Sequence, residues 1–258
     1  MKNIIGKVNL SKLNFLFILV VLSFLFNHPL YAYRYLPQPF SQMHQYYFNL
    51  GLGYAENIAG GTNSTYLLTQ PPIPGITTLN FHNTTHANGP EIKFAFGRIM
   101  QLDPHWFIGL GMQLIHDELT QKGYSILSYS TVKNAYTANI MVNNIGVVTQ
   151  VLYCFNHYWQ AFADLSTGVA FLKSDNYKNA SYGDTFASKL THNISYGVAI
   201  GLRHYLSDTV SVGINLGYRH LGKAKFGQFN VISPSEAVGT LEQSITILAA
   251  TLNFTYWF

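Results

Sequence analysis

Charged side chains are scarce in this chain, and five of them lie where they could form a buried polar network. Charged residues make up 10% of the 258 residues. The five share the polar side of segments in which apolar and polar residues alternate: Glu91, Lys93, Asp164, Arg203 and Arg219. A buried charge needs a partner, because removing an isolated charge from water is expensive. We therefore expect two layers of ion pairs, Asp164 with Arg203 and Glu91 with Arg219.

Such a network has two possible roles inside a closed sheet. It could plug and stabilise the interior, or it could line a narrow or gated polar pore. Polar residues that would line a pore share the same side: Asn49, Asn193, Asn215 and Asn253. Bulky residues on that side would narrow the lumen: Tyr47, Phe107, Phe162 and Trp257. Both roles remain open from the sequence.

Other residues give weaker indications of chemistry. His82 and His86 have a ligand-like gap, and His116 to Glu118 supply further donors, but no third ligand is spaced to complete a metal site. The single cysteine, Cys154, excludes an intramolecular disulfide framework. The glycines follow the alternation of the strands and do not form a phosphate-binding loop. We expect no metal, no cofactor and no enzymatic activity.

Strand periodicity supplies the elements that position these residues. From Leu248 to Phe258, large apolar side chains occupy one side and small, mostly polar ones the other, because side chains alternate faces along a strand. Seven more segments follow this pattern: 45–55, 90–101, 106–114, 136–151, 159–170, 190–203 and 210–219. Within 136–151 the apolar residues change parity at Asn143-Asn144, which predicts a β-bulge there.

The connections between the expected strands alternate between short turns and long loops. The long ones cover 56–89, 117–133, 173–188 and 222–241. This asymmetry is typical of an outer-membrane barrel with short periplasmic turns and longer extracellular loops. No apolar run after residue 32 is long enough for a membrane helix, and lipid tolerates no open sheet edge. The sequence predicts an all-β, eight-stranded antiparallel transmembrane β-barrel over residues 45–258.

The N-terminus reads as an export signal. Lys2, Lys7 and Lys12 precede an apolar run, and Ala32 ends a plausible cleavage site. We expect a signal peptide over 1–32 and a periplasmic lead-in over 33–44. The signal holds 3 of the 15 basic residues and none of the 11 acidic ones, which leaves 12 against 11. That balance gives no case for nucleic-acid binding.

A hairpin near the C-terminus resembles a known class. Gly201-Leu-Arg-His-Tyr-Leu-Ser-Asp208, then Val212-Gly-Ile-Asn-Leu-Gly-Tyr-Arg219, and the final Phe258 are similar to small barrels of the OmpA-type and opacity-protein families. The resemblance covers 45–258 as a pattern, and its motifs are architectural. No peptidoglycan-binding domain follows Phe258, so we expect no tethering to the cell wall. The His-x-Ser motif of outer-membrane lipid A deacylases does not occur.

The expected function follows from this architecture. We expect a monomeric bacterial outer-membrane protein with a structural or surface-interaction role, of the adhesion type, through its extracellular loops. A small-solute or ion diffusion channel of the porin kind is the alternative. We expect the partners of the protein to be outer-membrane lipid and lipopolysaccharide, and a host or cell-surface ligand at the four loops.

Overall fold

The computed structural model describes residues 46–59, 64–69, 76–82, 87–127, 134–179, 185–227, 229–230, 236–238 and 242–258. The expected signal peptide (1–32) and lead-in (33–44) lie outside the described residues. Within the described ranges, no helix is long and apolar enough to cross a membrane.

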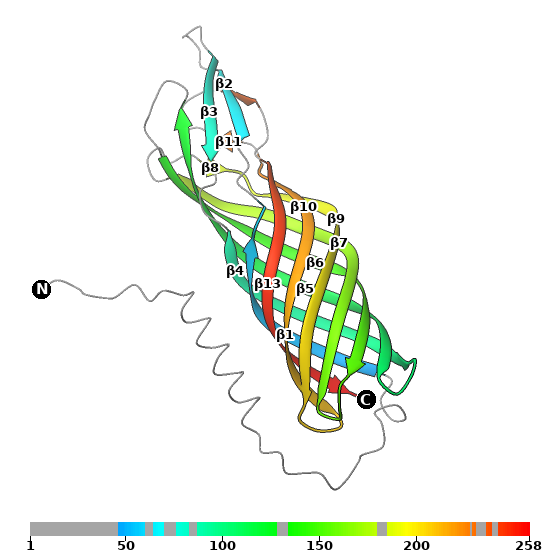
Figure 1. Ribbon diagram of the computed structural model, residues 1–258. Coiled ribbons are helices and arrows are strands. Elements are labelled where there is room, and N and C mark those ends of the chain that lie inside the picture. Colours follow the sequence, from blue (N-terminus) through cyan, green and yellow to red (C-terminus); the bar gives the residue numbers. More distant parts are fainter. Residues whose placement is uncertain are drawn as a thin grey trace, which may run out of the picture. The chain divides into compact units, whose positions relative to one another are not determined.

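Eight long strands form a closed antiparallel ring, as the sequence predicts (Figure 1). The pairs β1–β13 and β5–β6 complete the ring, so the barrel wall has no free lateral edge along its main body. The eight strands are β1 (Tyr46–Asn57), β4 (Asn88–Gln101), β5 (Trp106–Leu127), β6 (Asn134–Cys154), β7 (Trp159–Asn179), β9 (Lys189–Tyr205), β10 (Val210–Lys225) and β13 (Glu242–Trp257).

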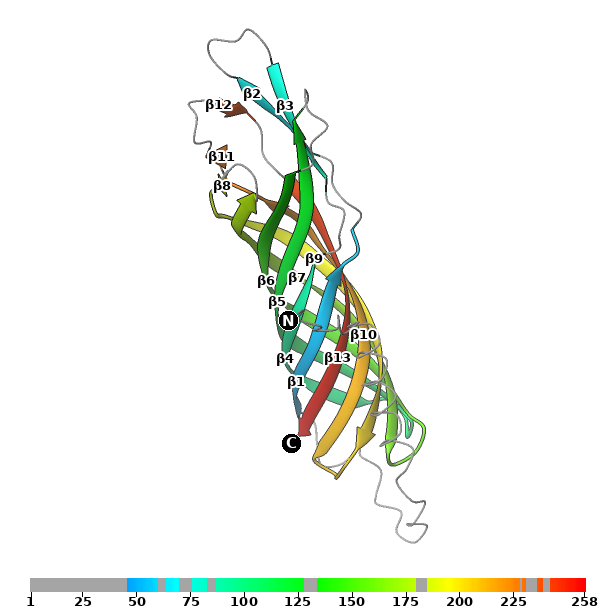
Figure 2. The ribbon, with the colours of Figure 1, turned by 90° about the vertical axis from the view of Figure 1, so that its left-hand side faces the viewer.

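The register of the ladders fixes the tilt of the strands. The cross-strand partners of Tyr47 lead through all eight strands and return to β1 at Asn57, ten residues further along. A sheet closes into a barrel only with such a stagger and with strands tilted against the axis, as Figure 2 shows. An eight-stranded barrel has an interior just wide enough for side chains to fill.

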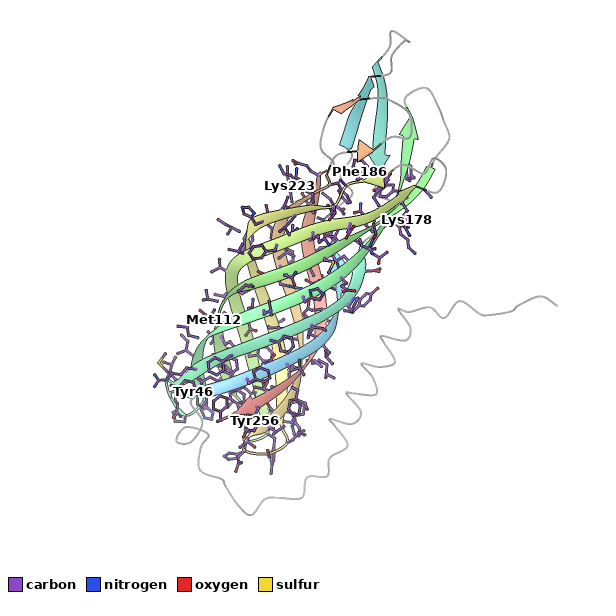
Figure 3. The ribbon with its side chains drawn as sticks, turned by 180° about the vertical axis from the view of Figure 1, so that it is seen from behind. Tyr46, Met112, Lys178, Phe186, Lys223 and Tyr256 are labelled. Carbon is purple, nitrogen blue, oxygen red and sulfur yellow. The ribbon has the colours of Figure 1, made fainter. Side chains whose placement is uncertain are left out.

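Large apolar side chains cover the outside of the barrel, which we call the belt. The side chain of Phe96 is 50% exposed and that of Leu110 is 58% exposed. Aromatic rings gather where short turns join the strands, which we call the turn end, around the labelled Tyr46 and Tyr256 (Figure 3). There Tyr46 stacks on Phe96 and Phe258. The belt comprises Leu52, Phe94, Phe96, Leu110, Met112, Val147, Leu165, Val198, Ile200, Leu216, Leu252 and Phe254.

Strands extend into the expected long connections, at the end of the barrel that we call the loop end. Strand β5 continues to Leu127 and β6 begins at Asn134, so most of the expected loop 117–133 is strand. Likewise β7 runs into 173–188, and β10 runs into 222–241, whose end is followed directly by β13. The shorter strands are β2 (Ser64–Thr69), β3 (Ile76–His82), β8 (Thr185–Phe186), β11 (Phe229–Asn230) and β12 (Glu236–Val238).

A hairpin occupies part of the expected loop 56–89. Strands β2 and β3 pair with each other, β3 pairs with the outer end of β5, and β12 pairs with β2. The strand pattern was weak here because both faces of a sheet beyond the belt can meet water, so apolar and polar residues need not alternate.

The predicted bulge at Asn143-Asn144 is wrong. Strand β6 pairs there without interruption, with His116 opposite Asn143 and Ile115 opposite Asn144. Val142 and Asn144 are both buried, so the inward parity is unchanged. The apolar residues change parity because the interior changes from polar to apolar at this level. The pairing of β6 with β7 shifts elsewhere, between Thr137 and Asn139, where β7 has the extra residue.

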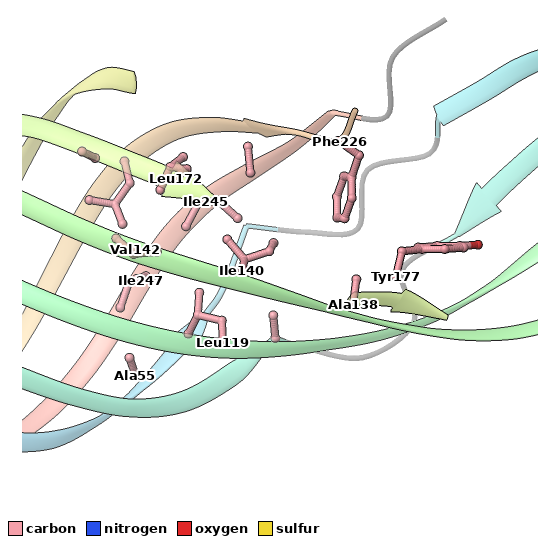
Figure 4. Packing of buried hydrophobic residues seen from close by; sticks show 14 of the residues in the cluster. Ala55, Leu119, Ala138, Ile140, Val142, Leu172, Tyr177, Phe226, Ile245 and Ile247 are labelled. Carbon is pink, nitrogen blue, oxygen red and sulfur yellow. The ribbon is translucent and has the colours of Figure 1, made fainter. Parts of the chain in front are cut away.

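Two apolar clusters fill the interior, one at each end. The turn-end cluster comprises Tyr47, Ala95, Ile99, Phe107, Leu152, Phe162, Tyr205 and Trp257. The loop-end cluster is larger (Figure 4) and includes Ala55, Leu119, Tyr136, Ala138, Ile140, Val142, Leu172, Tyr177, Phe186, Leu221, Ala224, Phe226, Ile245 and Ile247.

Candidate functional site

The candidate site is a polar chamber between the two apolar clusters. On β6, for example, Gln150 and Asn144 lie between Leu152 of the turn-end cluster and Val142 of the loop-end cluster. All eight strands contribute buried polar side chains to the chamber: Asn49, Glu91, Lys93, Gln113, Asp117, Asn144, Gln150, Asp164, Ser195, Asn215, Arg219, Thr251 and Asn253.

Arg219 holds two carboxylates together across the chamber. Its guanidinium donates to Glu91 Oε2, and also to Asp117 Oδ2 at 3.3 Å and Oδ1 at 3.1 Å. The hydroxyl of Thr251 donates to the other oxygen of Glu91 at 2.9 Å. The planar fork of arginine suits such two-fold contacts with carboxylates. Of the two expected ion pairs, the structure therefore contains the one between Glu91 and Arg219.

The expected pair of Asp164 with Arg203 is absent, and Asp164 lies against Lys93 instead. The distance from Lys93 Nζ to Asp164 Oδ2 is 3.5 Å. Gln150 donates a hydrogen bond of 2.9 Å to Oδ1 of the same carboxylate. The register explains the difference, because the direct partner of Arg203 on β7 is Gln160, four residues nearer the turn end than Asp164.

Arg203 packs against the aromatic rings of the turn-end cluster. Its guanidinium donates to Gln160 Oε1 at 2.9 Å. The carbon of the guanidinium lies 4.6 Å from the ring centre of Phe162 and 5.0 Å from that of Trp257. Attraction between a cation and an aromatic face stabilises a charge where no carboxylate reaches it. The Arg203 side chain and these rings therefore close the turn end of the chamber.

Asp117 is the member of the chamber that the sequence analysis did not place inside the barrel. It was assigned to the loop 117–133, whereas β5 continues through it and Asp117 lies opposite Val142 of β6. The sequence did contain an indication that Asp117 points inward, because Asp117 has the same parity along the strand as Gln113 and Ile115. A carboxylate at the end of a predicted strand gave no reason to extend the strand, since exposed loops carry such residues too.

The free space in the chamber is small. A cavity of about 20 Å³ is lined by Lys93, Asp164, Asn215, Arg219 and neighbouring side chains. Three buried oxygens of the chamber, Gln150 Oε1, Asp164 Oδ2 and Asn215 Oδ1, have no hydrogen-bond partner in the protein. Space of this size holds a water molecule when polar partners surround it. The chamber therefore has room for bound water and not for a wide aqueous path.

The histidine candidates do not assemble into a metal site in the described part of the chain. No group of three His, Cys, Asp or Glu residues there could hold a metal ion. His116 points outward, where its Nδ1 lies 2.8 Å from Asn143 Oδ1 and its Nε2 lies 3.5 Å from Glu118. The side chains of His82 and His86 lie outside the described residues. Cys154 is a half-buried free thiol that accepts a hydrogen bond from Gln160.

Comparison with known proteins identifies the fold and no closer relationship. No protein-family model and no curated protein matches the sequence. The outer membrane protein OprG from Pseudomonas aeruginosa matches with a TM-score of 0.52 at 15% identity, over 86% of this chain and 99% of that one. Neisserial surface protein A matches with a TM-score of 0.46 at 10% identity, over 83% and 97%.

The chain has the fold of a small outer-membrane β-barrel. A third match corrects one expectation from the sequence. The outer membrane protease OmpT from Escherichia coli matches with a TM-score of 0.49 at 10% identity, over 83% of this chain and 97% of that one. A protease among the matching structures overturns the expectation that the chain is not an enzyme. The likeness is one of fold and assigns no activity to this chain.

Proposed function

We propose that the chain is a bacterial outer-membrane barrel with a closed lumen, which presents a surface for interaction outside the cell. The belt supports the membrane location, because an outward apolar band between aromatic rings is the surface that lipid requires. The expected signal peptide supports export. Lipid and lipopolysaccharide would then surround a single copy of the barrel.

The single observation that carries the proposal is the closure of the lumen at both ends. Trp257 and Tyr47 in the turn-end cluster are 0% exposed. In the loop-end cluster, Ile140 and Ile245 are also 0% exposed. Water cannot form a continuous file through such apolar layers without displacing them, so a resting channel is disfavoured. The OmpA-type and opacity-like assignment is part of this proposal.

Regular sheet beyond the belt supports a role in presentation. Strands β5, β6 and β7 continue past the belt, and β3 extends the sheet from β5 by backbone hydrogen bonds. Backbone pairing fixes the positions of these segments, which favours a preformed surface over a set of flexible loops. We place the ligand contacts on 56–89, 117–133, 173–188 and 222–241.

The presented surface is tested by deleting part of it. Residues 60–86 are replaced by a short Gly-Ser linker, and whole bacteria expressing each form are compared for adherence to host cells or to immobilised matrix. Equal surface amounts and heat-modifiable gel migration establish that both barrels are folded. We expect adherence to fall to the level of cells without the protein. Unchanged adherence would contradict a role for this segment.

The channel is the second candidate, and the polar chamber is the observation that favours it. Its charges could line a path if the apolar clusters moved. Ion conductance separates the two candidates and is described at the end of the Discussion.

A further inference from the structure

The barrel wall contains a window at its loop end, between β9 and β10. Backbone pairing between these strands ends at Tyr196 and His220, although β9 continues to Lys189 and β10 to Lys225. Residues 189–195 of β9 keep partners on β7 and have none on β10 within the described ladders. Above the window, the backbone N–H of Gly227 donates to the carbonyl of Ala187 at 2.9 Å. The window is therefore bounded on both sides along the strands.

A bulge turns β10 inward at the window. The pairing of β10 with β13 shifts between His220 and Gly222, and Gly222 has a φ of 80°. A Cβ at Gly222 would lie 2.7 Å from the Cβ of Asn193, closer than real Cβ atoms approach. Glycine is therefore required both by the left-handed backbone and by the close crossing of β9. On either side of it, Leu221, Ala224 and Phe226 enter the loop-end cluster.

Side chains, and not a ladder, hold β10 across the window. Asn193 Nδ2 donates to the carbonyl of Lys223 at 3.0 Å, and Thr191 Oγ1 reaches the same carbonyl at 3.4 Å. Ser174 Oγ donates to the carbonyl of Lys225 at 2.8 Å. Three isolated bonds of this kind separate more readily than a continuous ladder, whose bonds break cooperatively.

Both sides of the window are apolar. On the outer face of β9, Leu190 is 61% exposed and Ile194 is 77% exposed, the highest value among the exposed large apolar residues. Directly inside lie Leu221, Ala224 and Ile245, all 0% exposed. The outside of the window continues the belt upward, so in a membrane it meets the outer leaflet. Lys223 and His192 lie at the level where polar headgroups would be, and the side chain of Lys223 is 62% exposed.

We propose that this window is a lateral portal through which an acyl chain of an outer-leaflet lipid reaches the loop-end cluster. The proposal rests on the proposed membrane location and adds a ligand class to it. The occupant is an acyl chain because the outer face of β9 and the interior behind the window are both apolar. The polar side chains of Asn193 and Thr191 only bridge the gap between them, through their bonds to the carbonyl of Lys223. The segment from Gly222 to Lys225 stays paired with β13, so opening means separating it from β9 by breaking the side-chain bonds across the window. This separation would leave the turn end closed.

A photoreactive lipid tests the portal. The mature chain is refolded into vesicles that contain a phospholipid with a diazirine on its acyl chain, and labelled residues are identified by mass spectrometry after illumination. We expect labels on inward residues Leu221, Ala224 and Ile245 as well as on outward residues such as Leu216. Labels confined to outward residues would overturn the portal. An absence of label at Leu216 as well would overturn the membrane location itself.

A matched pair of variants tests the side-chain bond that joins β9 to β10 across the window. Asn193→Ala removes the bond to Lys223 and should raise labelling of the inward residues several-fold. Asn253→Ala removes a 3.3 Å bond from an asparagine side chain to Thr251 in the chamber, away from the window, and should leave labelling unchanged. Heat-modifiable migration verifies folding of both. Equal labelling in both variants would contradict the proposal, as would a dimer crosslinked through residues 189–195, since a second copy would then cover the window.

Discussion

Arg219 and Asp117 are 102 residues apart in the chain and are joined by two hydrogen bonds across the barrel interior. The same guanidinium holds Glu91, so one cation neutralises part of two buried carboxylates. Asp117 is 0% exposed and Glu91 is 4% exposed. Through Asp117 and Glu91, Arg219 joins β10 to β5 and β4 on the far side of the ring.

Replacing Arg219 tests how much this contact contributes to the free energy of unfolding. Arg219→Ala leaves two carboxylates buried without their cation, so we expect the free energy of unfolding to fall by about 3–5 kcal/mol. Urea unfolding of the refolded protein in lipid vesicles measures it. Arg98→Ala, on the outside near the Tyr46 ring, is the control and should cost less than about 1 kcal/mol. Equal losses in the two variants would contradict the contact.

A double-mutant cycle tests the partner of Asp164. The effects of Lys93→Met and Asp164→Asn on unfolding should be non-additive by about 0.5–3 kcal/mol, because the two side chains touch. The cycle of Asp164→Asn with Arg203→Met should be additive within about 0.5 kcal/mol. A larger coupling energy between Asp164 and Arg203 than between Asp164 and Lys93 would favour the pairing expected from the sequence.

Gly222 tests the inward turn of β10. Gly222→Ala forces a Cβ into Asn193 at a φ of 80°, so we expect a loss of about 1–3 kcal/mol in unfolding free energy. Gly217→Ala on the same strand is the matched control, because its Cβ would lie at an ordinary 3.6 Å from Ala199. A similar loss at both glycines would show that the inward turn imposes no special demand.

Glu242, at the loop end of β13 and outside the belt, gives a pH test. A hydrogen bond from Lys225, aided by Lys223, lowers the pKa of Glu242 below its ordinary value. A lowered pKa in the folded state means that the contact stabilises the fold above the unfolded pKa and is lost as pH falls through the folded pKa. NMR titration of Lys225→Gln should show the pKa of Glu242 move back up. An unmoved pKa would contradict the contact.

The sequence correctly predicted the eight strands whose outer faces form the belt, and it predicted the loop end poorly. From β9 to β10, large outward residues alternate with small inward ones, and both strands lie where parity placed them. The belt imposes that alternation, because one face must meet lipid and the other must fit a narrow interior. Beyond the belt the constraint disappears, so the outer parts of β5 and β7 and the β2–β3 hairpin were assigned to loops.

The candidate site was predictable by residue type and not by pairing. Parity placed Glu91, Lys93, Asp164, Arg203 and Arg219 inside, and all five are buried. Which charges meet depends on the ten-residue stagger of the ring, and periodicity within a strand carries no information about that stagger. Asp164 was therefore assigned to Arg203 when its neighbour is Lys93.

Ion conductance tests the closed lumen most directly. Residues 33–258, the chain without the expected signal peptide, are refolded, checked for heat-modifiable migration and inserted into a planar bilayer. Because apolar clusters close both ends of the polar chamber, we predict no steady current from folded protein. Reproducible, stable conductance steps would contradict the closed lumen and favour the diffusion channel.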